Sequence, residues 1–334
     1  MRTSTASSAL PNVLYDEFGR KFEYLRLSIT DRCNFKCQYC LPDGDQSSAK
    51  TSFLSVEESL TLVKAFAMMG TRKVRITGGE PALRRDLTDL IAALSALPEI
   101  EKVSLTTNGY NLLKYIDRWH AAGLSSINVS VDSFDPRQFE QITGDNRLTL
   151  ILKGIERAQA LGMSVKINSV LLKTYAADQW QHCLDWVKHH KLTLRFIELM
   201  QTGDNRDYFN VQHQSGELIR QRMLAQGWSL VAPEQYAGPA LEYSHPDYLG
   251  KIGLIMPYSK DFCVSCNRLR VTAQGKLHLC LFASDAYDLR SAINSADPLA
   301  VVQQVKSLIG LKLDKHYLQD GNSGITRHLA MLGG

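Results

Sequence analysis

Between Tyr24 and Met200, short runs rich in β-branched residues alternate with longer stretches of helical periodicity. This alternation is typical of successive βα units around a parallel sheet. The predicted strands span Tyr24 to Thr30, Lys73 to Gly78, Val103 to Asn108, Ile127 to Asp132, Val165 to Leu171 and Leu194 to Met200. Six units are too few for a complete eight-stranded barrel, so the pattern predicts an open barrel or a doubly wound α/β sheet.

A helix predicted between the first two strands has both of its ends marked in the sequence. Ser55 and Glu58 have the S-x-x-E spacing of a capping box, and Gly70 stands where the helix would stop. Either topology brings the carboxyl ends of the strands to one face. The loops DRCNFKCQYC, TGGEP, TTNG and SVDS each follow a predicted strand, so we expect the chemistry at that face.

The alternation ends after Met200. A predicted helix from Glu217 to Gln226 precedes strand-like runs with a turn at Gln274 and Gly275, and an amphipathic helix follows near Pro298 to Leu311. We therefore expect three parts. They are a flexible leader over residues 1–22, a partial barrel over residues 23–200 and a smaller α+β module over residues 201–334.

Composition and charge narrow the functional class. With 44% hydrophobic and 22% charged residues, the chain has the composition of an ordinary globular protein. It has no apolar run long enough to cross a bilayer and no signal-peptide core, which predicts a cytoplasmic protein without a membrane partner. The net charge of +4 comes without dense Lys/Arg blocks, which argues against a nucleic-acid partner and favours a small anionic substrate.

Three of the seven cysteines, Cys33, Cys37 and Cys40, lie within eight residues after the first predicted strand. An odd number of cysteines in a chain expected in the cytoplasm favours metal binding over disulfides. Structural zinc usually takes four protein ligands, whereas a cubane iron–sulfur cluster held by three thiolates keeps one iron open for another ligand. The alternatives are buried, non-ligating cysteines or a zinc site completed by a distant histidine.

A second group of three cysteines follows in FCVSCNRLRVTAQGKLHLC. Cys263 and Cys266 have C-x2-C spacing, and thirteen residues separate Cys266 from Cys280. A zinc ribbon completed by His278 or another histidine competes with an iron–sulfur site. Spacing alone leaves both interpretations open.

The spacing C-x3-C-x2-C, followed by TGGEP one unit later, closely resembles the radical S-adenosylmethionine superfamily. Further motifs are RFIELM at Arg195–Met200, CNRLR at Cys266–Arg270 and the terminal Gly333–Gly334. Together they are similar to the GTP 3',8-cyclase family of molybdenum cofactor biosynthesis. The resemblance extends from about Tyr24 to the last residue and favours the incomplete (βα)6 TIM-like barrel with a C-terminal module.

The resemblance implies a lyase that uses S-adenosylmethionine and two 4Fe-4S clusters. The first cluster would cleave S-adenosylmethionine to a 5'-deoxyadenosyl radical, which abstracts the 3' hydrogen of GTP before the ribose closes onto C8 of the guanine. The second cluster would hold the guanine base. Expected partners are an electron donor such as a flavodoxin or ferredoxin, the downstream cyclic pyranopterin monophosphate synthase and a second copy of the chain in a homodimer. The Gly-Gly tail would insert into the active site.

The resemblance also implies roles for individual residues. The cluster ligands would be Cys33, Cys37 and Cys40 at the first site and Cys263, Cys266 and Cys280 at the second. Contacts with S-adenosylmethionine would come from Tyr39, Gly78, Gly79, Glu80, Ser130 and Met200. Contacts with GTP would come from Arg26, Arg75, Thr106, Lys166, Arg268, Leu269 and Arg270, with Arg268, Arg270 and the first three cysteines counted as catalytic.

The residues themselves support part of this assignment. Arg26, Arg75 and Lys166 lie within strands that helices should cover, so we expect them to point into the barrel. Phosphates favour guanidinium partners in a partly desolvated pocket. The alternative is a purely structural role, with arginine side chains that extend to the strand ends and a Met200 side chain that packs in the core.

Two other functions compete with this interpretation. One is another radical S-adenosylmethionine enzyme that has an auxiliary cluster and modifies a peptide, although such proteins usually have a longer cysteine series in the C-terminal module. The other is a zinc-binding adaptor without catalytic activity. Iron content and cleavage of S-adenosylmethionine would separate an enzyme from the adaptor.

Overall fold

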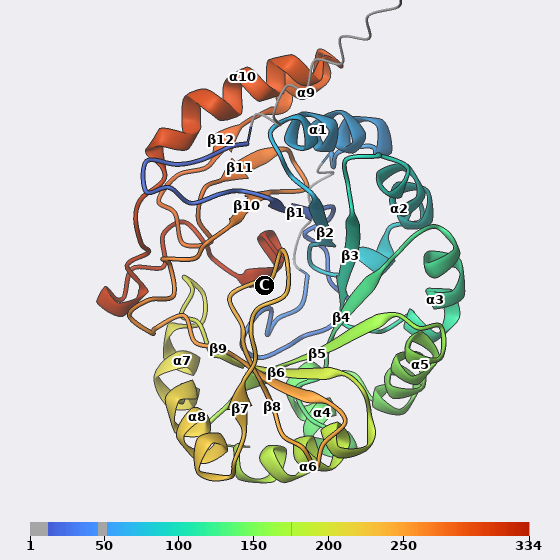
Figure 1. The fold of residues 1–334 in the computed structure, drawn as a ribbon, viewed down its shortest axis with the longest axis vertical. Helices are drawn as coiled ribbons and strands as arrows, with labels where there is room; N and C mark the ends of the chain where they lie inside the picture. The colour runs from blue at the N-terminus through green and yellow to red at the C-terminus, as the bar shows by residue number, and fades with distance from the viewer. Residues whose placement is uncertain (1–12, 46–51, 175, 334) are drawn as a thin grey trace, which may run out of the picture.

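A 12-stranded sheet forms the centre of the computed structural model, which describes residues 13–45, 52–174 and 176–333. The strand order is β12-β11-β10-β1-β2-β3-β4-β5-β6-β9-β8-β7, an open order with β12 and β7 at its two edges. Figure 1 shows the strands curving around a central space, with the helices outside and the C-terminal end of the chain inside. The predicted incomplete barrel is confirmed.

The six predicted strands are all present. They are β1 (Tyr24–Ser28), β2 (Lys73–Thr77), β3 (Lys102–Thr107), β4 (Ser126–Ser130), β5 (Ser164–Leu171) and β6 (Thr193–Glu198). Each pairs in parallel with the next. Most end one or two residues earlier than predicted, because the chain leaves the sheet for the loops that bear the motifs.

The chain after Met200 extends the sheet at both edges. On one edge β10 (Arg268–Val271) pairs in parallel with β1, and on the other β9 (Lys251–Ile255) pairs in parallel with β6. Beyond them lie the antiparallel strands β11 (Lys276–His278) and β12 (Tyr287–Asp288), and β8 (Leu241–Ser244) and β7 (Ser229–Leu230). The C-terminal residues therefore complete the walls of the barrel.

Helices cover the outer face of the sheet (Figure 1). Those between the barrel strands are α1 (Val56–Met68), α2 (Leu87–Ser95), α3 (Leu112–Ala121), α4 (Pro136–Thr143), α5 (Leu148–Ala160) and α6 (Ala176–His189). Those after β6 are α7 (Arg206–Gln212), α8 (Gly216–Ala225), α9 (Arg290–Asn294) and α10 (Pro298–Leu308). Short 3-10 turns are η1 (Pro81–Leu83), η2 (Ile309–Leu311), η3 (Leu318–Asp320) and η4 (Leu329–Met331). Among the described residues, every helix is too short or too polar to reach across a lipid bilayer.

The predicted capping box is confirmed at the start of α1. The Ser55 hydroxyl accepts from the Glu58 backbone N–H at 3.1 Å, and the Glu58 carboxylate accepts from the Ser55 N–H at 2.7 Å. The helix buries Leu62, Val63 and Phe66 against the sheet. Side chains on the outer face of the strands meet these helices, so the apolar core surrounds the barrel and leaves its interior to polar groups.

The described part of the predicted flexible leader is packed against the barrel. Leu14 and Phe22 are 5% and 1% exposed and belong to the main core. The Leu14 backbone N–H donates to the Met69 carbonyl oxygen at 2.9 Å, and Tyr15 and Lys21 form an isolated antiparallel bridge. Because residues 13–22 pack against the barrel, the expectation of a flexible leader does not hold for them. The rest of the predicted leader, residues 1–12, lies outside the described residues.

We expect Phe22→Ala to lower the free energy of unfolding by about 3–5 kcal/mol, the usual cost of removing a buried aromatic ring. Phe18→Ala is the matched control, because Phe18 is 53% exposed, and it should cost at most about 1 kcal/mol. Denaturant unfolding of the purified chain measures both values. Equal losses for the two variants would contradict the packing of this segment.

Candidate active site

Arg26, Arg75 and Arg270 occupy matching positions on three neighbouring strands. Arg26 on β1 is the register partner of Arg270 on β10 and of Arg75 on β2. Neighbouring strands are about 4.8 Å apart, so the three guanidinium groups project side by side into the barrel. Burial, and then the positive charges of Arg270 and Arg75, lower the pKa of Arg26 to about 9. Like charges in such a row repel, so the arrangement favours an anionic ligand.

This arginine row faces a cavity with about 1410 Å³ of empty space, part of which is open to solvent. The basic side chains that line the cavity are Arg26, Lys73, Arg75, Lys102, Lys166, Arg195, Arg268 and Arg270. The cavity thus brings together most of the predicted GTP contacts, namely Arg26, Arg75, Thr106, Lys166, Arg268 and Arg270. Guanidinium and ammonium groups gathered in a partly desolvated space are suited to phosphate.

Leu269 lies on the opposite face of β10. Successive side chains of a strand alternate between its two faces, so Leu269 points away from Arg268 and Arg270. It is 1% exposed and belongs to the core between the sheet and the helices. The Leu269 side chain therefore does not face the cavity, and contact of Leu269 with GTP, which its backbone would have to make, stays a prediction.

One carboxylate balances part of the positive charge. Glu242 on β8 accepts from Lys166 Nζ at 3.0 Å and from Arg195 Nη2 at 2.6 Å. Burial would raise the pKa of Glu242, but Arg195 and Lys166 outweigh it and hold the pKa below its usual value. Glu242 lies more than seventy positions after Lys166 in the sequence, so nothing local to either residue predicted this pair.

The cavity wall includes two residues, Tyr24 and Lys73, that were not predicted from the sequence although strand alternation indicates them. Tyr24 and Lys73 each stand two positions before an arginine of the row, on the same strand, so strand alternation places them on the same face. The Tyr24 hydroxyl accepts from Arg75 Nε. Burial would raise the pKa of Tyr24, but the charges of Arg75, Arg26 and Lys73 outweigh it and lower the pKa to about 7.

The first cysteine group lies on the loop that follows β1. The backbone N–H of Cys40 donates to the Cys37 carbonyl oxygen at 2.9 Å, and the Lys36 N–H donates to the Thr143 carbonyl oxygen at 2.9 Å. These bonds curl the loop and fasten it to the end of α4. Burial raises the pKa of Cys33 to about 11 and that of Cys40 to about 12.

Gly78 and Gly79 pack directly against the start of this cysteine loop. A Cβ on Gly78 would lie 2.2 Å from the Thr30 carbonyl oxygen, and one on Gly79 would lie 2.2 Å from the Arg32 carbonyl oxygen. The Gly79 N–H also donates to the Thr30 carbonyl oxygen at 2.9 Å. Backbone of the cysteine loop therefore fills the space that side chains would need. Contact of these glycines with S-adenosylmethionine stays a prediction.

Glu80 is fully buried and holds the end of β3. Its carboxylate accepts from the Thr107 hydroxyl at 2.8 Å, the Asn108 N–H at 2.6 Å and the Ala82 N–H at 2.9 Å. Burial raises the pKa of Glu80 to about 7, although these hydrogen bonds oppose the shift. The described contacts of Glu80 fasten the TGGEP loop to the neighbouring strand.

Tyr39 is anchored at both its side chain and its backbone. Its hydroxyl donates to Asp132 Oδ2 at 2.8 Å, and its carbonyl oxygen accepts from Asn205 Nδ2 at 3.0 Å. Ser130, at the end of β4, is the register partner of Asn168. The described contacts of Tyr39 are packing and anchoring contacts, and contact of Tyr39 or Ser130 with S-adenosylmethionine stays a prediction.

The second cysteine group lines the basic cavity. Cys263, Cys266 and Cys280 share its wall with Arg268, whose Nη2 lies 3.9 Å from Cys266 Sγ. Burial would raise the pKa of Cys266, but the positive charges of Arg268 and Lys312 outweigh it and lower the pKa to about 6. Among the described residues, no group of three His, Cys, Asp or Glu side chains lies in an arrangement that could hold a single metal ion. Three soft thiolate donors on one cavity wall fit an iron–sulfur cluster.

The two cysteine groups approach the same interior region. Cys40 and Cys280 both pack against one apolar cluster. That cluster consists of Met200, Leu281, Phe282, Leu318, Leu329 and Leu332. Met200 also lines the cavity, which is compatible with its predicted contact but equally with a packing role.

The C-terminal tail enters the barrel beside the arginine row. The Gly333 carbonyl oxygen accepts from Arg26 Nη2 at 2.5 Å. Gly333 has φ +65°, and a Cβ there would lie 2.0 Å from Thr77 Oγ1, so this position requires glycine. Gly334 lies outside the described residues. The last described residues of the chain therefore form part of the cavity region.

We expect Gly79→Ala to displace the cysteine loop, because its Cβ would overlap the Arg32 carbonyl group. Iron retention by the first cysteine group, measured anaerobically in a C263A/C266A/C280A background, should fall about tenfold. Gly310→Ala is the control, since among the described residues a Cβ there would meet only Glu17 Oε1, at 3.5 Å. Equal iron retention in the two variants would show that the close approach does not matter.

Two family models match successive parts of the chain. The one described as the radical SAM superfamily matches residues 27–187, and the one described as Molybdenum Cofactor Synthesis C matches residues 192–318. The crystal structure of Streptococcus suis SuiB bound to S-adenosylmethionine matches with a TM-score of 0.59 at 13% identity, over 93% of this chain and 77% of that one. At this identity the likeness concerns the fold alone.

Relatives of the same length are much more similar in sequence. The GTP 3',8-cyclase of Mannheimia succiniciproducens is 52% identical over 326 residues, which are 97% of each chain. The GTP 3',8-cyclase of Vibrio parahaemolyticus is 53% identical over 323 residues, which are 96% of this chain and 97% of that one. These relatives confirm the resemblance inferred from the motifs, and the chain belongs to the GTP 3',8-cyclase family of the radical SAM superfamily.

Proposed function

We propose that this protein converts GTP to (8S)-3',8-cyclo-7,8-dihydroguanosine 5'-triphosphate, the first step of molybdenum cofactor biosynthesis. The observation that supports this most directly is the arginine row, which faces the same cavity as the second cysteine group. A nucleoside triphosphate combines the anionic group that such a row requires with a base that an adjacent metal centre can hold. The names of the full-length relatives agree with this function.

Membership of the radical SAM superfamily implies S-adenosylmethionine and one 4Fe-4S cluster, which Cys33, Cys37 and Cys40 would hold. When bound, these groups supply the carbon-centred radical that removes a hydrogen atom from the substrate. A second 4Fe-4S cluster on Cys263, Cys266 and Cys280 is part of the proposal. Its support is the position of these thiols on the cavity wall and the three-cysteine composition that leaves one iron free.

The protein's own side chains would bind and orient GTP. Arg26, Arg75 and Arg270 stand side by side on neighbouring strands, and guanidinium forks of this kind can bind phosphate oxygens with two bonds each. A triphosphate would also relieve the mutual repulsion of the row. Lys166 lines the same cavity and donates to Glu242 at 3.0 Å, so its ammonium group has a defined position before the substrate arrives. Fixed donors of this kind hold the ribose still while the new bond forms.

We also propose the wider setting of the reaction. The electron that cleavage of S-adenosylmethionine consumes would come from a flavodoxin or ferredoxin, and the product would pass to cyclic pyranopterin monophosphate synthase. The protein would act in the cytoplasm as a homodimer. These statements rest on the family relationship and on the chemistry of the reaction.

Anaerobic incubation with GTP, S-adenosylmethionine and a reductant tests the function. We expect a product isomeric with GTP, separated by chromatography, and transfer of deuterium from 3'-deuterated GTP into 5'-deoxyadenosine. Arg270→Ala should weaken GTP binding about 10- to 100-fold, the cost of a lost charge-assisted hydrogen bond. Arg157→Ala is the control, because Arg157 pairs with Asp117 on the exposed surface.

Three outcomes would contradict the proposal. Cleavage of S-adenosylmethionine without label transfer from GTP would indicate another substrate, with peptides as the next candidates. Purified protein that contains stoichiometric zinc and no iron would indicate an adaptor. GTP affinity that is equal in the Arg270 and Arg157 variants would remove the arginine row from substrate binding.

The tail provides a separate prediction. Because Gly333 bonds to Arg26 and has no room for a Cβ, a short peptide added after Gly334 should abolish turnover while both clusters remain bound. The same peptide added before Met1 serves as the control. Turnover and iron content of the two extended proteins measure the effect, and full activity of the C-terminally extended form would contradict it.

A further inference from the structure

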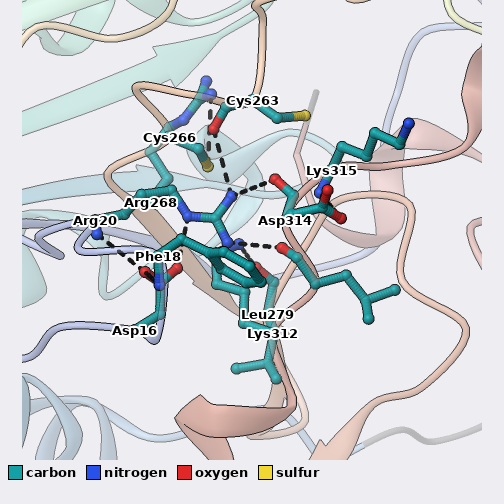
Figure 2. A network of polar contacts seen from close by, with 11 residues as sticks. Asp16, Phe18, Arg20, Cys263, Cys266, Arg268, Leu279, Lys312, Asp314 and Lys315 are labelled. Atoms are coloured by element: carbon teal, nitrogen blue, oxygen red, sulfur yellow. Dashed lines mark hydrogen bonds and ion pairs between the residues drawn. The ribbon is translucent and has the colours of Figure 1, made fainter.

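The guanidinium group of Arg20 joins three segments of the chain beside the second cysteine group (Figure 2). Its Nε forms a buried ion pair with Asp16 Oδ2 at 2.6 Å. Its Nη2 donates to the Leu313 carbonyl oxygen at 2.6 Å, and its Nη1 donates to those of Asp314 at 2.6 Å and Cys263 at 3.4 Å. Arg20 thus ties residues 313 and 314 to the loop that begins at Cys263.

This junction needs the shape of arginine as well as its charge. Arg20 is 7% exposed, and its bonds point in several directions from one planar group. A guanidinium has five N–H donors in a fixed fork, whereas an ammonium is a single point charge on a flexible stem. Asp16 neutralises the buried cation and fixes its orientation. Lysine at position 20 would keep the charge but could not span the same carbonyl groups.

Lys312 adds a second buried cation to the same region. Its side chain is 4% exposed, and its ammonium donates to the carbonyl oxygen of Leu279, the neighbour of Cys280 (Figure 2). Burial lowers the pKa of Lys312, and the groups that most oppose this shift are the Cys266 and Cys280 thiolates. A buried ammonium is costly unless negative charge lies close to it. The negative charge that suits Lys312 is therefore that of the cysteine sulfurs.

The segment that Arg20 holds also contacts the cysteines through its backbone. His316 lines the same cavity as Cys263, and its backbone opposes the rise that burial causes in the pKa of the Cys263 thiol. Residues 312–316, which we name the support segment, therefore bring the Lys312 ammonium and the His316 residue to the region of the second cysteine group. Arg20 fixes the middle of the support segment at Leu313 and Asp314.

We propose that Arg20 and Lys312 are positioning residues for the iron–sulfur centre of the second cysteine group. Arg20 fixes the support segment against the Cys263 loop, and Lys312 places its ammonium group on the Leu279 carbonyl oxygen, beside Cys280. This inference rests on the proposed function, which places a cluster on these cysteines. It also gives the described part of the N-terminal leader a function, since Asp16 and Arg20 both belong to it.

A cation beside thiolate ligands affects a cluster in two ways. It offsets the negative charge of the sulfurs, which strengthens metal retention, and it stabilises the reduced state, which raises the reduction potential. Removal of the Lys312 charge should therefore weaken iron retention and make the potential more negative. Removal of the Arg20 fork should loosen the support segment and weaken iron retention even when a positive charge remains.

The test isolates the second centre in the full-length chain. In a C33A/C37A/C40A background reconstituted anaerobically with iron and sulfide, bound iron belongs to the second cysteine group. Lys312→Met, Lys312→Arg and Lys315→Met are compared by the half-life of the cluster against an iron chelator and by its midpoint potential. Lys315 is the matched control, because it lies on the support segment but is exposed (Figure 2).

We expect Lys312→Met to shorten the half-life about tenfold and to shift the potential to more negative values. Lys312→Arg should retain both properties, and Lys315→Met should match the parent. Arg20→Lys keeps the positive charge but loses the guanidinium fork, and Arg20→Gln loses both. If the fork is what matters, the two variants should shorten the half-life equally. Lys21→Met is its control, since Lys21 pairs only with Glu23 at the surface among the described residues.

A reciprocal background, C263A/C266A/C280A, separates positioning from a general loss of stability. Iron retention and the spectrum of the first centre should not change there in Lys312→Met or Arg20→Lys. An equal loss of iron at the first centre would overturn the inference. So would a Lys312→Met half-life and potential equal to those of Lys315→Met. Neither result would argue against the second cluster itself. Absence of iron at the second cysteine group in the parent would refute the proposed cluster itself, and the inference with it.

Discussion

The row formed by Arg270, Arg26 and Arg75 is the constraint on which the rest of the structure depends. Three guanidinium groups in register on adjacent parallel strands cannot be packed in an apolar core. The interior of the barrel must therefore stay polar and open to an anion, and the apolar core must lie outside, between the strands and the helices. The alternation of Leu25, Arg26 and Leu27 on β1 expresses both requirements in three residues.

An interior that holds an anion also explains why the sheet is open. A filled eight-stranded barrel leaves no room for a ligand. Here β10 and β9 flank the six βα strands in parallel, and the remaining C-terminal strands run antiparallel beyond them. This arrangement brings Arg268, Arg270 and the second cysteine group to the same cavity as the strands that carry Arg26 and Arg75. The C-terminal residues contribute to the binding site as directly as the barrel does.

Local patterns predicted the parts of the structure that local physics determines. The six strands, the capping box at Ser55 and the cysteine loop after β1 were all visible, because strand alternation, helix capping and ligand spacing act over a few residues. The same alternation places the Leu269 side chain in the outer core, so its predicted contact with GTP would have to come from its backbone.

Contacts between distant segments had no such signal. The pairing of β10 with β1, the Lys166–Glu242 ion pair and the bonds of Arg20 to residues more than two hundred positions away are decided by tertiary packing. A short segment such as residues 13–22, with only Leu14 and Phe22 as large buried apolar side chains, has too little periodicity to indicate burial. Its apolar side chains become informative only once the surface that receives them is known.

The two cysteine groups lie in regions of opposite charge. Burial and nearby carboxylates, Glu80 for Cys33 and Asp132 for Cys37, raise the thiol pKa values of the first group. The guanidinium of Arg268 and the ammonium of Lys312 act in the opposite direction on Cys266. S-adenosylmethionine carries a sulfonium cation and a nucleoside triphosphate is strongly anionic, so each region suits one of the two molecules. The charges around the two cysteine groups therefore agree with the proposed binding of the cofactor at the first group and of GTP beside the second.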